Sequence, residues 1–239
     1  MEVHAHSHTP RKKWMHYLWE FLMLFLAVFC GFLAEYKLEH IVEHNREKEY
    51  MQSMAEDLQQ DIAEISRILK FVDLQRAELD SLLNQLELYS STHVLDVKKL
   101  YQRHFDNFGA NVATFSERTL SQLKNAGGLR LIRIKSVADS ISIYDSKIQY
   151  LSLVGKTYDE VSTDVGIAGY AIFDNRFFRA NFTDNFIQLI TTDAKTLREY
   201  SNRVFTLYTV ANYYYSYLAK QKELAKKLIC LIKKDYHLK

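Results

Sequence analysis

Two histidines and a glutamate between residues 40 and 44 are the first candidates for chemistry. His40, Glu43 and His44 form an H-x-x-E-H pattern, which occurs in one group of zinc proteases. On a helix the two histidines would lie one turn apart on one face and could share a metal ion. A catalytic zinc also needs a third protein ligand and a cleft, which a stretch beside an apolar segment does not provide. We therefore keep the three residues as weak metal candidates, with adventitious metal contact as the alternative.

Other patterns that could carry chemistry are few. His4, His6 and His8 lie in a polar N-terminal stretch that could be a pH-sensitive tail or could capture a metal. Residues 181–183 form an N-glycosylation sequon. The sequence contains no phosphate-binding glycine loop and no nucleophile elbow, so we predict no catalytic residue, no cofactor and no enzymatic activity. The near-zero net charge of +2 gives no reason to expect a nucleic-acid partner.

An apolar stretch near the N-terminus predicts one membrane-spanning helix. The chain from Phe21 to Ala34 carries no charge, and Tyr17 to Ala34 would form about 27 Å of helix at ~1.5 Å per residue. A hydrocarbon core of ~30 Å needs about this length. A signal peptide would have a shorter apolar core, and a soluble buried helix is rarely apolar on every face. We assign residues 14–36 to a transmembrane helix embedded in the lipid bilayer.

Charged residues near the span bear on its orientation and its contacts. Three basic residues are clustered at 11–13, directly before the span, whereas the three that follow it are spread over residues 37–48. The cluster favours a cytoplasmic N-terminus, with residues 1–13 as a disordered tail and the body on the opposite side. Glu20 lies near one end of the span. Its carboxylate could reach the aqueous edge, or it could take part in contacts with a partner helix.

Residues 37–90 predict one long helix that continues directly from the span. Residues 35–90 contain no proline and no glycine. An apolar row with alternating spacings of four and three is typical of a helix that packs along its length. Its members are Leu58, Ile62, Ile65, Leu69, Val72, Arg76, Leu79, Leu83 and Leu86, with Arg76 as the one break.

The middle of the soluble domain, residues 95–170, predicts several shorter helices. A capping box at 114–117 would begin one of them, and Gly127 would end it. Ser136 would begin the next helix, which the glycines between 155 and 169 can bend or end.

A second long helix is predicted at 185–234, beginning near Asp184 or Asp193. From Val204 onward its apolar row again alternates four and three, so it can return along the first long helix and pack against it in the antiparallel sense. The row comprises Leu197, Val204, Tyr208, Ala211, Tyr215, Leu218, Lys222, Ala225, Ile229 and Ile232. The sequence therefore predicts an all-α protein: one N-terminal transmembrane helix continuing into a helical hairpin or bundle that fills residues 37–239.

The last predicted helix carries two surfaces with a possible role. A group of tyrosines could simply pack within the domain, or it could form a partner-binding face with Glu20 as a second contact point; its members are Tyr208, Tyr213, Tyr214, Tyr215 and Tyr217. Residues 220–239 hold seven lysines and two acidic residues. They could form a solvated helix end, or they could contact anionic lipid headgroups.

Two segments carry a resemblance to a known group of proteins. WEFLMLFLAVFCGFLAEY, followed by LEH and REKEYMQSMAEDLQQDI, resembles the start of a family of single-pass membrane proteins of unknown function from Bacteroidetes-type bacteria. TFSERTLSQLKNAGGLRLIRIKSVADSISIY is similar to that family's central L-K-x-x-G-x-L-R-L-I segment. The resemblance covers roughly residues 14–150. It implies a bacterial inner-membrane protein with a helical body, and it implies no catalytic residue.

These observations lead to one functional expectation and two alternatives. We expect a scaffold or sensor-type protein in the inner membrane, with a periplasmic body that acts through contacts in a homo-oligomer or with a membrane-protein partner. One alternative is an accessory subunit of a transport or envelope complex. The other is an extracytoplasmic ligand-sensing domain, which would require a pocket among the helices.

Overall fold

The computed structural model describes residues 14–92, 96–107, 109–125, 127–179 and 187–238. Every regular element within these ranges is a helix, so the predicted all-α fold class is confirmed. The histidines at 4, 6 and 8, the predicted tail and the sequon at 181–183 lie outside the described residues. In chain order the elements are α1 (Trp14–Thr92), α2 (Val97–Asp106), α3 (Arg118–Asn125), the short 3₁₀ helix η1 (Gly128–Arg130), α4 (Lys135–Gly169), α5 (Asn175–Arg179) and α6 (Ala194–Asp235).

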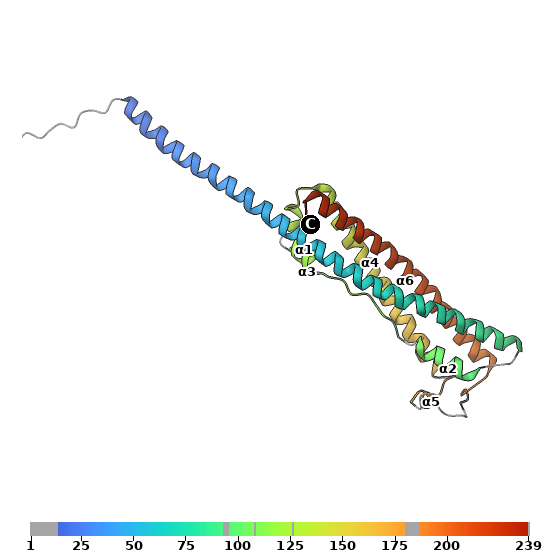
Figure 1. Cartoon of the computed structure of the whole chain (residues 1–239). Coiled ribbons are helices and arrows are strands. Elements are labelled where there is room, and N and C mark those ends of the chain that lie inside the picture. The colour runs from blue at the N-terminus through green and yellow to red at the C-terminus, as the bar shows by residue number, and fades with distance from the viewer. Residues whose placement is uncertain (1–13, 93–95, 108, 126, 180–186, 239) are drawn as a thin grey trace, which may run out of the picture. The chain divides into compact units, whose positions relative to one another are not determined.

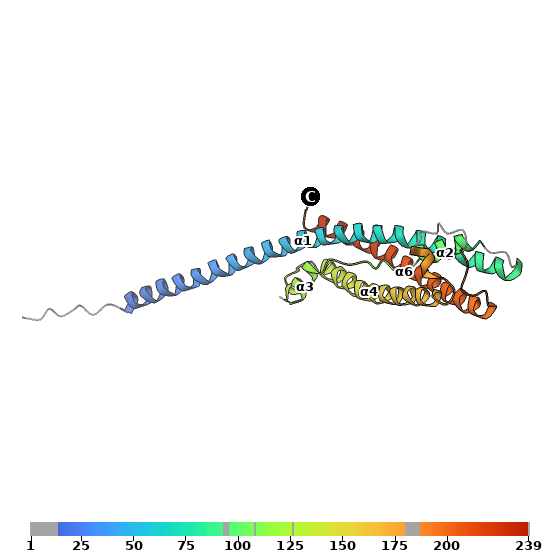
Figure 2. The same ribbon diagram turned by 90° about the horizontal axis from the view of Figure 1, so that it is seen from below.

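The chain divides into two compact units, Met1–Glu49 and Tyr50–Lys239. Helix α1 contributes residues to both units. In the second unit, the part of α1 that follows Glu49 lies side by side with α4 and α6, as the two perpendicular views show (Figures 1 and 2). The shorter elements α2, α3, η1 and α5 lie in the connections between these three long helices.

Hydrogen bonds between buried side chains define the direction of α4 relative to α1. The Tyr144 hydroxyl donates to an Asp61 carboxylate oxygen at 2.7 Å, and the Tyr158 hydroxyl donates to the side-chain oxygen of Gln75. Both pairs are separated by 83 positions in the chain, so the two helices run parallel and keep the same register over four turns.

Helix α6 runs in the opposite direction to α4. Arg203 donates to Asp164 near one end of the pair, and the rings of Tyr217 and Tyr150 meet edge to face at 5.2 Å farther along. The position on α6 therefore rises as the position on α4 falls. Because α4 is parallel to α1, α6 also returns antiparallel to α1, as the sequence predicts for the two long helices.

The core of the second unit is built from rows of buried residues spaced three and four apart. Such spacing keeps one stripe of a helix against its neighbours over its whole length. Burying one large aliphatic side chain contributes about 1.5–3 kcal/mol to the stability of the folded state. The row on α1 comprises Met51, Met54, Leu58, Asp61, Ile65, Ile68, Val72, Gln75, Leu79, Leu82 and Leu86, and the row on α6 comprises Leu197, Tyr200, Val204, Leu207, Ala211, Tyr214, Leu218, Gln221, Ala225, Leu228 and Ile232.

Four members of each predicted row were placed one residue too far along the helix. On α1 the members at 58, 65, 72, 79 and 86 are buried as predicted, but the intervening positions are only partly buried: Ile62, Leu69, Arg76 and Leu83. On α6 the same correction applies to Tyr208, Tyr215, Lys222 and Ile229. The buried row and the predicted row lie side by side on each helix, and the packing of the helices selects the one that includes Asp61, Gln75 and Gln221.

Two glycines of α4 allow other parts of the chain to approach closely. A Cβ atom on Gly155 would lie 2.8 Å from a Val112 methyl carbon, and one on Gly169 would lie 2.2 Å from the His104 ring. Both distances are shorter than carbon atoms tolerate, so a larger residue would push these neighbours away. The helix passes through Gly155 and ends at Gly169.

Candidate functional site

The first unit exposes a long series of apolar side chains. Between residues 14 and 42 the tryptophans, phenylalanines, leucines and other large apolar residues are exposed, among them Phe21, Leu24 and Phe32. In the described part of the chain, α1 is the one helix that is long and apolar enough to cross a membrane. Exposed apolar surface on this scale is rare in water and marks contact with a membrane or with protein.

Glu20 lies within this apolar stretch and has a local partner. Its carboxylate oxygen is 3.1 Å from Nε2 of His16, four residues earlier on the same helix face. Both side chains are about half exposed. The pair places two groups that can form hydrogen bonds at one end of the apolar stretch, where interfacial water or a neighbouring helix can reach them.

The H-x-x-E-H residues are not assembled into a metal site. Nε2 of His40 lies 2.9 Å from the Tyr36 hydroxyl, and Nδ1 of His44 lies 3.8 Å from a carboxylate oxygen of Glu47. The two histidines thus contact different neighbours on α1. Among the residues that the structure describes, no three His, Cys, Asp or Glu side chains form a group that could hold a metal ion. Glu43 also lies on α1 and is partly buried.

The tyrosines of α6 are divided between the core and the surface. Tyr213 is 62 % exposed, whereas Tyr214 is 1 % exposed and its hydroxyl accepts the backbone N–H of Ala113 at 2.8 Å. Tyr214 is therefore a core residue and cannot belong to an exposed binding face. Tyr208 is partly buried.

The two remaining tyrosines contact neighbouring helices at the edge of the core. The guanidinium carbon of Arg76 lies 4.5 Å from the centre of the Tyr215 ring, and Tyr217 packs against Tyr150 of α4. The Arg76 side chain also donates to Asn212 at 2.6 Å. The arginine that breaks the predicted apolar row thus joins α1 to α6 through a cation–π contact and a hydrogen bond.

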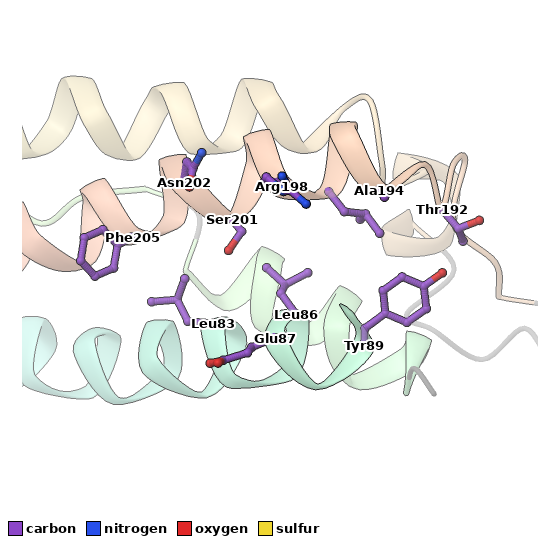
Figure 3. A pocket seen from close by; sticks show the side chains of 11 residues that line it. Leu83, Leu86, Glu87, Tyr89, Thr192, Ala194, Arg198, Ser201, Asn202 and Phe205 are labelled. Atoms are coloured by element: carbon purple, nitrogen blue, oxygen red, sulfur yellow. The ribbon is translucent and has the colours of Figure 1, made fainter. Parts of the chain in front are cut away.

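A cleft of about 700 Å³ opens between α1 and the first turns of α6 (Figure 3). Leu83 and Leu86 of α1 and Ser201 of α6 point into the space between the two helices. The cleft is lined by Leu83, Leu86, Glu87, Tyr89, Thr192, Ala194, Leu197, Arg198, Ser201, Asn202 and Phe205. The volume lies within the range of sites that hold a small molecule or a few side chains of a partner.

The cleft combines an apolar floor with polar groups at its rim. Leu86 and Leu197 are buried at the bottom, and Phe205 is 59 % exposed at one end. Arg198 and Asn202 are exposed on the α6 side. Such a surface can bury an apolar group and form hydrogen bonds to a polar one.

The α6 side of the cleft starts at a well-defined helix end. The Asp193 side chain accepts the backbone N–H of Thr196 at 2.9 Å, and it also accepts the Thr196 hydroxyl. These hydrogen bonds hold the pKa of Asp193 below its usual value. Of the two start positions that the sequence offers, the structure therefore uses Asp193, and this cap fixes where Ala194 and Arg198 lie at the rim.

Two buried aspartates of α1 hold the segment before α3. Asp57 accepts the backbone N–H of Thr119 at 3.0 Å and pairs with Arg118 at 2.8 Å, and Asp61 accepts the N–H of Ser116 at 2.8 Å. Helix α3 begins at Arg118, four residues after the start that the 114–117 capping box predicts. A carboxylate from a different helix caps it, because Asp57 is already in reach of the first free N–H groups.

Asp61 has the more unusual environment of the two. It is 2 % exposed, and burial, as the largest cause, raises the pKa of its carboxyl above the usual value, although the hydrogen bonds from Ser116 and Tyr144 act in the opposite direction. Burial also raises the pKa of the Tyr144 hydroxyl. Sequence reasoning missed these residues. The sequence did contain a signal for the burial of Asp61. Met51, Met54 and Leu58 are spaced three and four apart, and Asp61 continues this spacing.

A buried histidine occupies the opposite end of the core. Nδ1 of His104 lies 2.8 Å from the Tyr200 hydroxyl, and its ring stacks on Phe173 with centres 4.2 Å apart. Burial lowers the pKa of His104 to about 4, so the imidazole is neutral at physiological pH. In this position it acts as a packed, hydrogen-bonded core residue.

Comparison with known proteins adds no assignment to these sites. No protein-family model, no curated protein and no solved structure matches the chain.

Proposed function

We propose that the chain is a single-pass membrane protein whose helical unit, residues 50–239, works by binding another protein. The observation that carries this proposal is the exposed apolar surface of α1 between residues 14 and 42, which needs a bilayer around it. The helical unit adds a cleft and exposed aromatic side chains, of which Phe205 and Tyr213 are the most accessible on α6. Exposed aromatic residues are typical of binding surfaces.

The proposal includes a location and an orientation. The basic cluster at 11–13 supports a cytoplasmic N-terminus, and the helical unit would then lie on the far side of the membrane. The resemblance of residues 14–150 to a Bacteroidetes-type family supports the inner membrane of a bacterium and a periplasmic body. Glu20 and His16 supply a polar pair through which the anchor could contact a second copy or a membrane-protein partner, as an accessory subunit would.

A second candidate function, ligand sensing, is favoured by the cleft between α1 and α6. Its volume of about 700 Å³ is sufficient for a small molecule with an apolar part and a hydrogen-bonding end. Arg198, Ser201 and Asn202 would meet the polar end, and Leu83 and Leu86 the apolar part.

Photocrosslinking in native membranes tests the two functions together. A photoreactive phenylalanine analogue would replace Phe205 or Tyr213, and the control would replace Leu74, which is 62 % exposed on α1 and does not line the cleft. We expect protein-sized adducts at one or both test positions and none at the control. An adduct of a few hundred daltons at Phe205 alone would favour ligand sensing. Only uncrosslinked monomer at both test positions would refute the protein-binding function.

A further inference from the structure

A second open groove lies between α4 and α6, away from the cleft described above. Its volume is about 680 Å³. Ile143 and Tyr150 are each about half exposed on the α4 side, and Tyr217 and Leu224 are partly buried on the α6 side. The groove is lined by Ile143, Lys147, Tyr150, Leu151, Tyr217, Ala219, Lys220, Gln221, Glu223, Leu224 and Lys227. Ile143 and Tyr150 are seven residues apart, so the apolar floor extends over about two helical turns, roughly 10 Å.

The antiparallel register places two lysines level with each other across this groove. Tyr150 meets Tyr217 edge to face at 5.2 Å, and this pair fixes which residues of α4 and α6 are neighbours. Lys147 lies three residues before Tyr150, and Lys220 lies three residues after Tyr217. Because the two helices are antiparallel, these equal offsets bring both lysines to the same height along the groove. Like charges that face one another cost energy unless an anion lies between them or beside them.

The groove has an excess of positive charge, although Glu223 interacts electrostatically with Lys227. Lys147, Lys220 and Lys227 are exposed, and none of them forms an ion pair with another described residue. The Lys220 ammonium lies 5.4 Å from the centre of the Tyr217 ring, which is a cation–π contact and neutralises no charge. The one acidic residue at the groove, Glu223, is held by Lys226 at 2.7 Å. A partner would therefore meet three cations beside an apolar floor.

We propose that this groove binds an acidic amphipathic helix of another protein. An apolar stripe on that helix would cover Ile143, Tyr150 and Leu224, and glutamates or aspartates beside the stripe would pair with the lysines. The bound helix would lie against α4 and α6 as a fourth long helix of the bundle. The proposal rests on the proposed protein-binding function, and it specifies the chemistry of the partner.

Charge argues against a second copy of this chain as the occupant. A two-fold symmetric contact pairs the same surface patch on both chains. The lysines of one groove would then face the lysines of the other, with Glu223 already paired in each copy. Such an arrangement of like charges is unfavourable. An acidic partner removes this cost and is attracted to the groove from a distance.

Direct binding of designed peptides to the full chain in nanodiscs of neutral lipid tests the proposal. Two labelled helical peptides of about 18 residues share one leucine stripe and differ only in flanking residues, glutamate in one and lysine in the other. Fluorescence anisotropy reports the dissociation constants. We expect the glutamate peptide to bind at least ~10-fold more tightly than the lysine peptide, and its affinity to fall as salt rises.

Two charge-reversed variants identify the binding surface. Lys147→Glu/Lys220→Glu should weaken binding of the glutamate peptide at least ~10-fold, whereas the matched control Lys70→Glu/Lys98→Glu, with the same change in net charge, should alter it less than ~2-fold. Circular dichroism would verify that both variants keep their helix content. Equal losses in the two variants, equal binding of the two peptides or no peptide binding would each overturn the proposal.

Anionic lipid headgroups are the other class of ligand that could bind this groove, and they must be distinguished from an acidic helix. Vesicles containing about a third phosphatidylglycerol, offered to the nanodisc-embedded chain, should not compete with the glutamate peptide. Competition by these vesicles on the wild-type chain, together with direct vesicle binding that Lys147→Glu/Lys220→Glu abolishes, would overturn the proposal and show that the groove binds lipid headgroups. The crosslinking at Phe205 and Tyr213 reports on other surfaces, so its outcome tests the protein-binding function independently of this groove.

Discussion

Individual polar residues inside the bundle specify how its long helices align. A buried carboxylate or amide must find a hydrogen-bond partner, because an unsatisfied one costs about 1–3 kcal/mol. Asp61 and Gln75 of α1 each find a tyrosine hydroxyl on α4, and Gln221 of α6 donates to the backbone oxygen of Tyr144 at 3.4 Å. A shift of one turn between α1 and α4 would separate both pairs at once. Apolar contacts alone would tolerate such a shift more easily.

The buried His104 makes the stability of the helical unit depend on pH. Its pKa is about 4 in the folded chain against 6.5 for the unfolded group. Between these values the unfolded chain binds the proton and the folded chain does not, so stability is lost as the pH falls from about 6.5 to about 4. The expected loss is roughly 3 kcal/mol, at ~1.4 kcal/mol per pH unit. Thermal unfolding of the full chain in detergent micelles, followed by circular dichroism at several pH values, measures it.

The variant His104→Phe isolates this contribution from that of other groups. Phenylalanine can keep the stacking on Phe173 but has no proton to bind, although it loses the hydrogen bond to Tyr200. Asp61 acts in the opposite sense, since burial raises its pKa and its contribution to stability falls as the pH rises through that raised pKa. The difference in pH-dependent stability between wild type and variant should therefore equal the contribution of His104. The same pH slope in both proteins would contradict the burial of a neutral His104.

At the scale of secondary structure, each long helix presents two apolar rows and buries only one of them fully. On α1, Ile68 is completely buried and the adjacent Leu69 is partly exposed. Each of them lies three or four residues from both Ile65 and Val72, so either fits the alternating spacing. The choice between them depends on where α4 and α6 approach, which is a property of the packed bundle.

Adjacent alanine substitutions on α1 test which row forms the core. Ile68→Ala removes a side chain with no exposed surface and should destabilise the helical unit by about 2–4 kcal/mol, because it leaves a cavity. Leu69→Ala should cost less than about 1.5 kcal/mol, and both changes introduce the same residue into the same helix. Thermal unfolding of each variant gives the comparison. If Leu69→Ala lost more stability than Ile68→Ala, the row predicted from apolar spacing would be the buried one.

At the scale of the whole molecule, the two units differ in the polarity of their exposed surfaces. Residues 14–42 expose their large apolar side chains, whereas the described residues from 50 onward bury a core of apolar side chains and leave others, such as Phe205 and Tyr213, exposed among charged residues. The difference follows from sequence: the first stretch is apolar around the helix, and the later helices are apolar on one stripe. This contrast is the physical reason for our proposal of a membrane-spanning helix joined to a helical unit that binds another protein.

The orientation of the two units across the membrane can be measured with one cysteine. Cys230 is exposed on α6, and Cys30→Ala leaves it as the single thiol. For a periplasmic helical unit, we expect a membrane-impermeant maleimide to label Cys230 in cells whose outer membrane is permeabilised but whose inner membrane is intact.

The tail supplies the matching control for this experiment. Cys30→Ala/Cys230→Ala with Ser7→Cys carries its only thiol in the tail, and this thiol should react only after the cells are lysed. The reverse pattern, with Cys230 labelled only after lysis and Ser7→Cys labelled before it, would place the helical unit in the cytoplasm.

The sequence alone determines the helical class and the long apolar stretch near the start of α1. One proline and seven glycines in 239 residues leave few breaks for turns, and periodic apolar spacing is a local signal that needs no knowledge of neighbours. Gly127, which directly precedes η1, likewise has a positive φ of 64°, because glycine adopts this conformation without strain. These features depend on residues a few positions apart, so they can be predicted from the chain itself.

Only the tertiary structure decides which row is buried, what caps α3 and where the openings lie. Asp61 looks like a surface residue until Tyr144, 83 positions later, supplies its partner. Asp57 caps a helix that begins 61 positions after it. The cleft and the groove likewise arise where side chains of two helices fail to fill the space between them. Each of these depends on pairs distant in sequence, and their contact is established only when the helices pack.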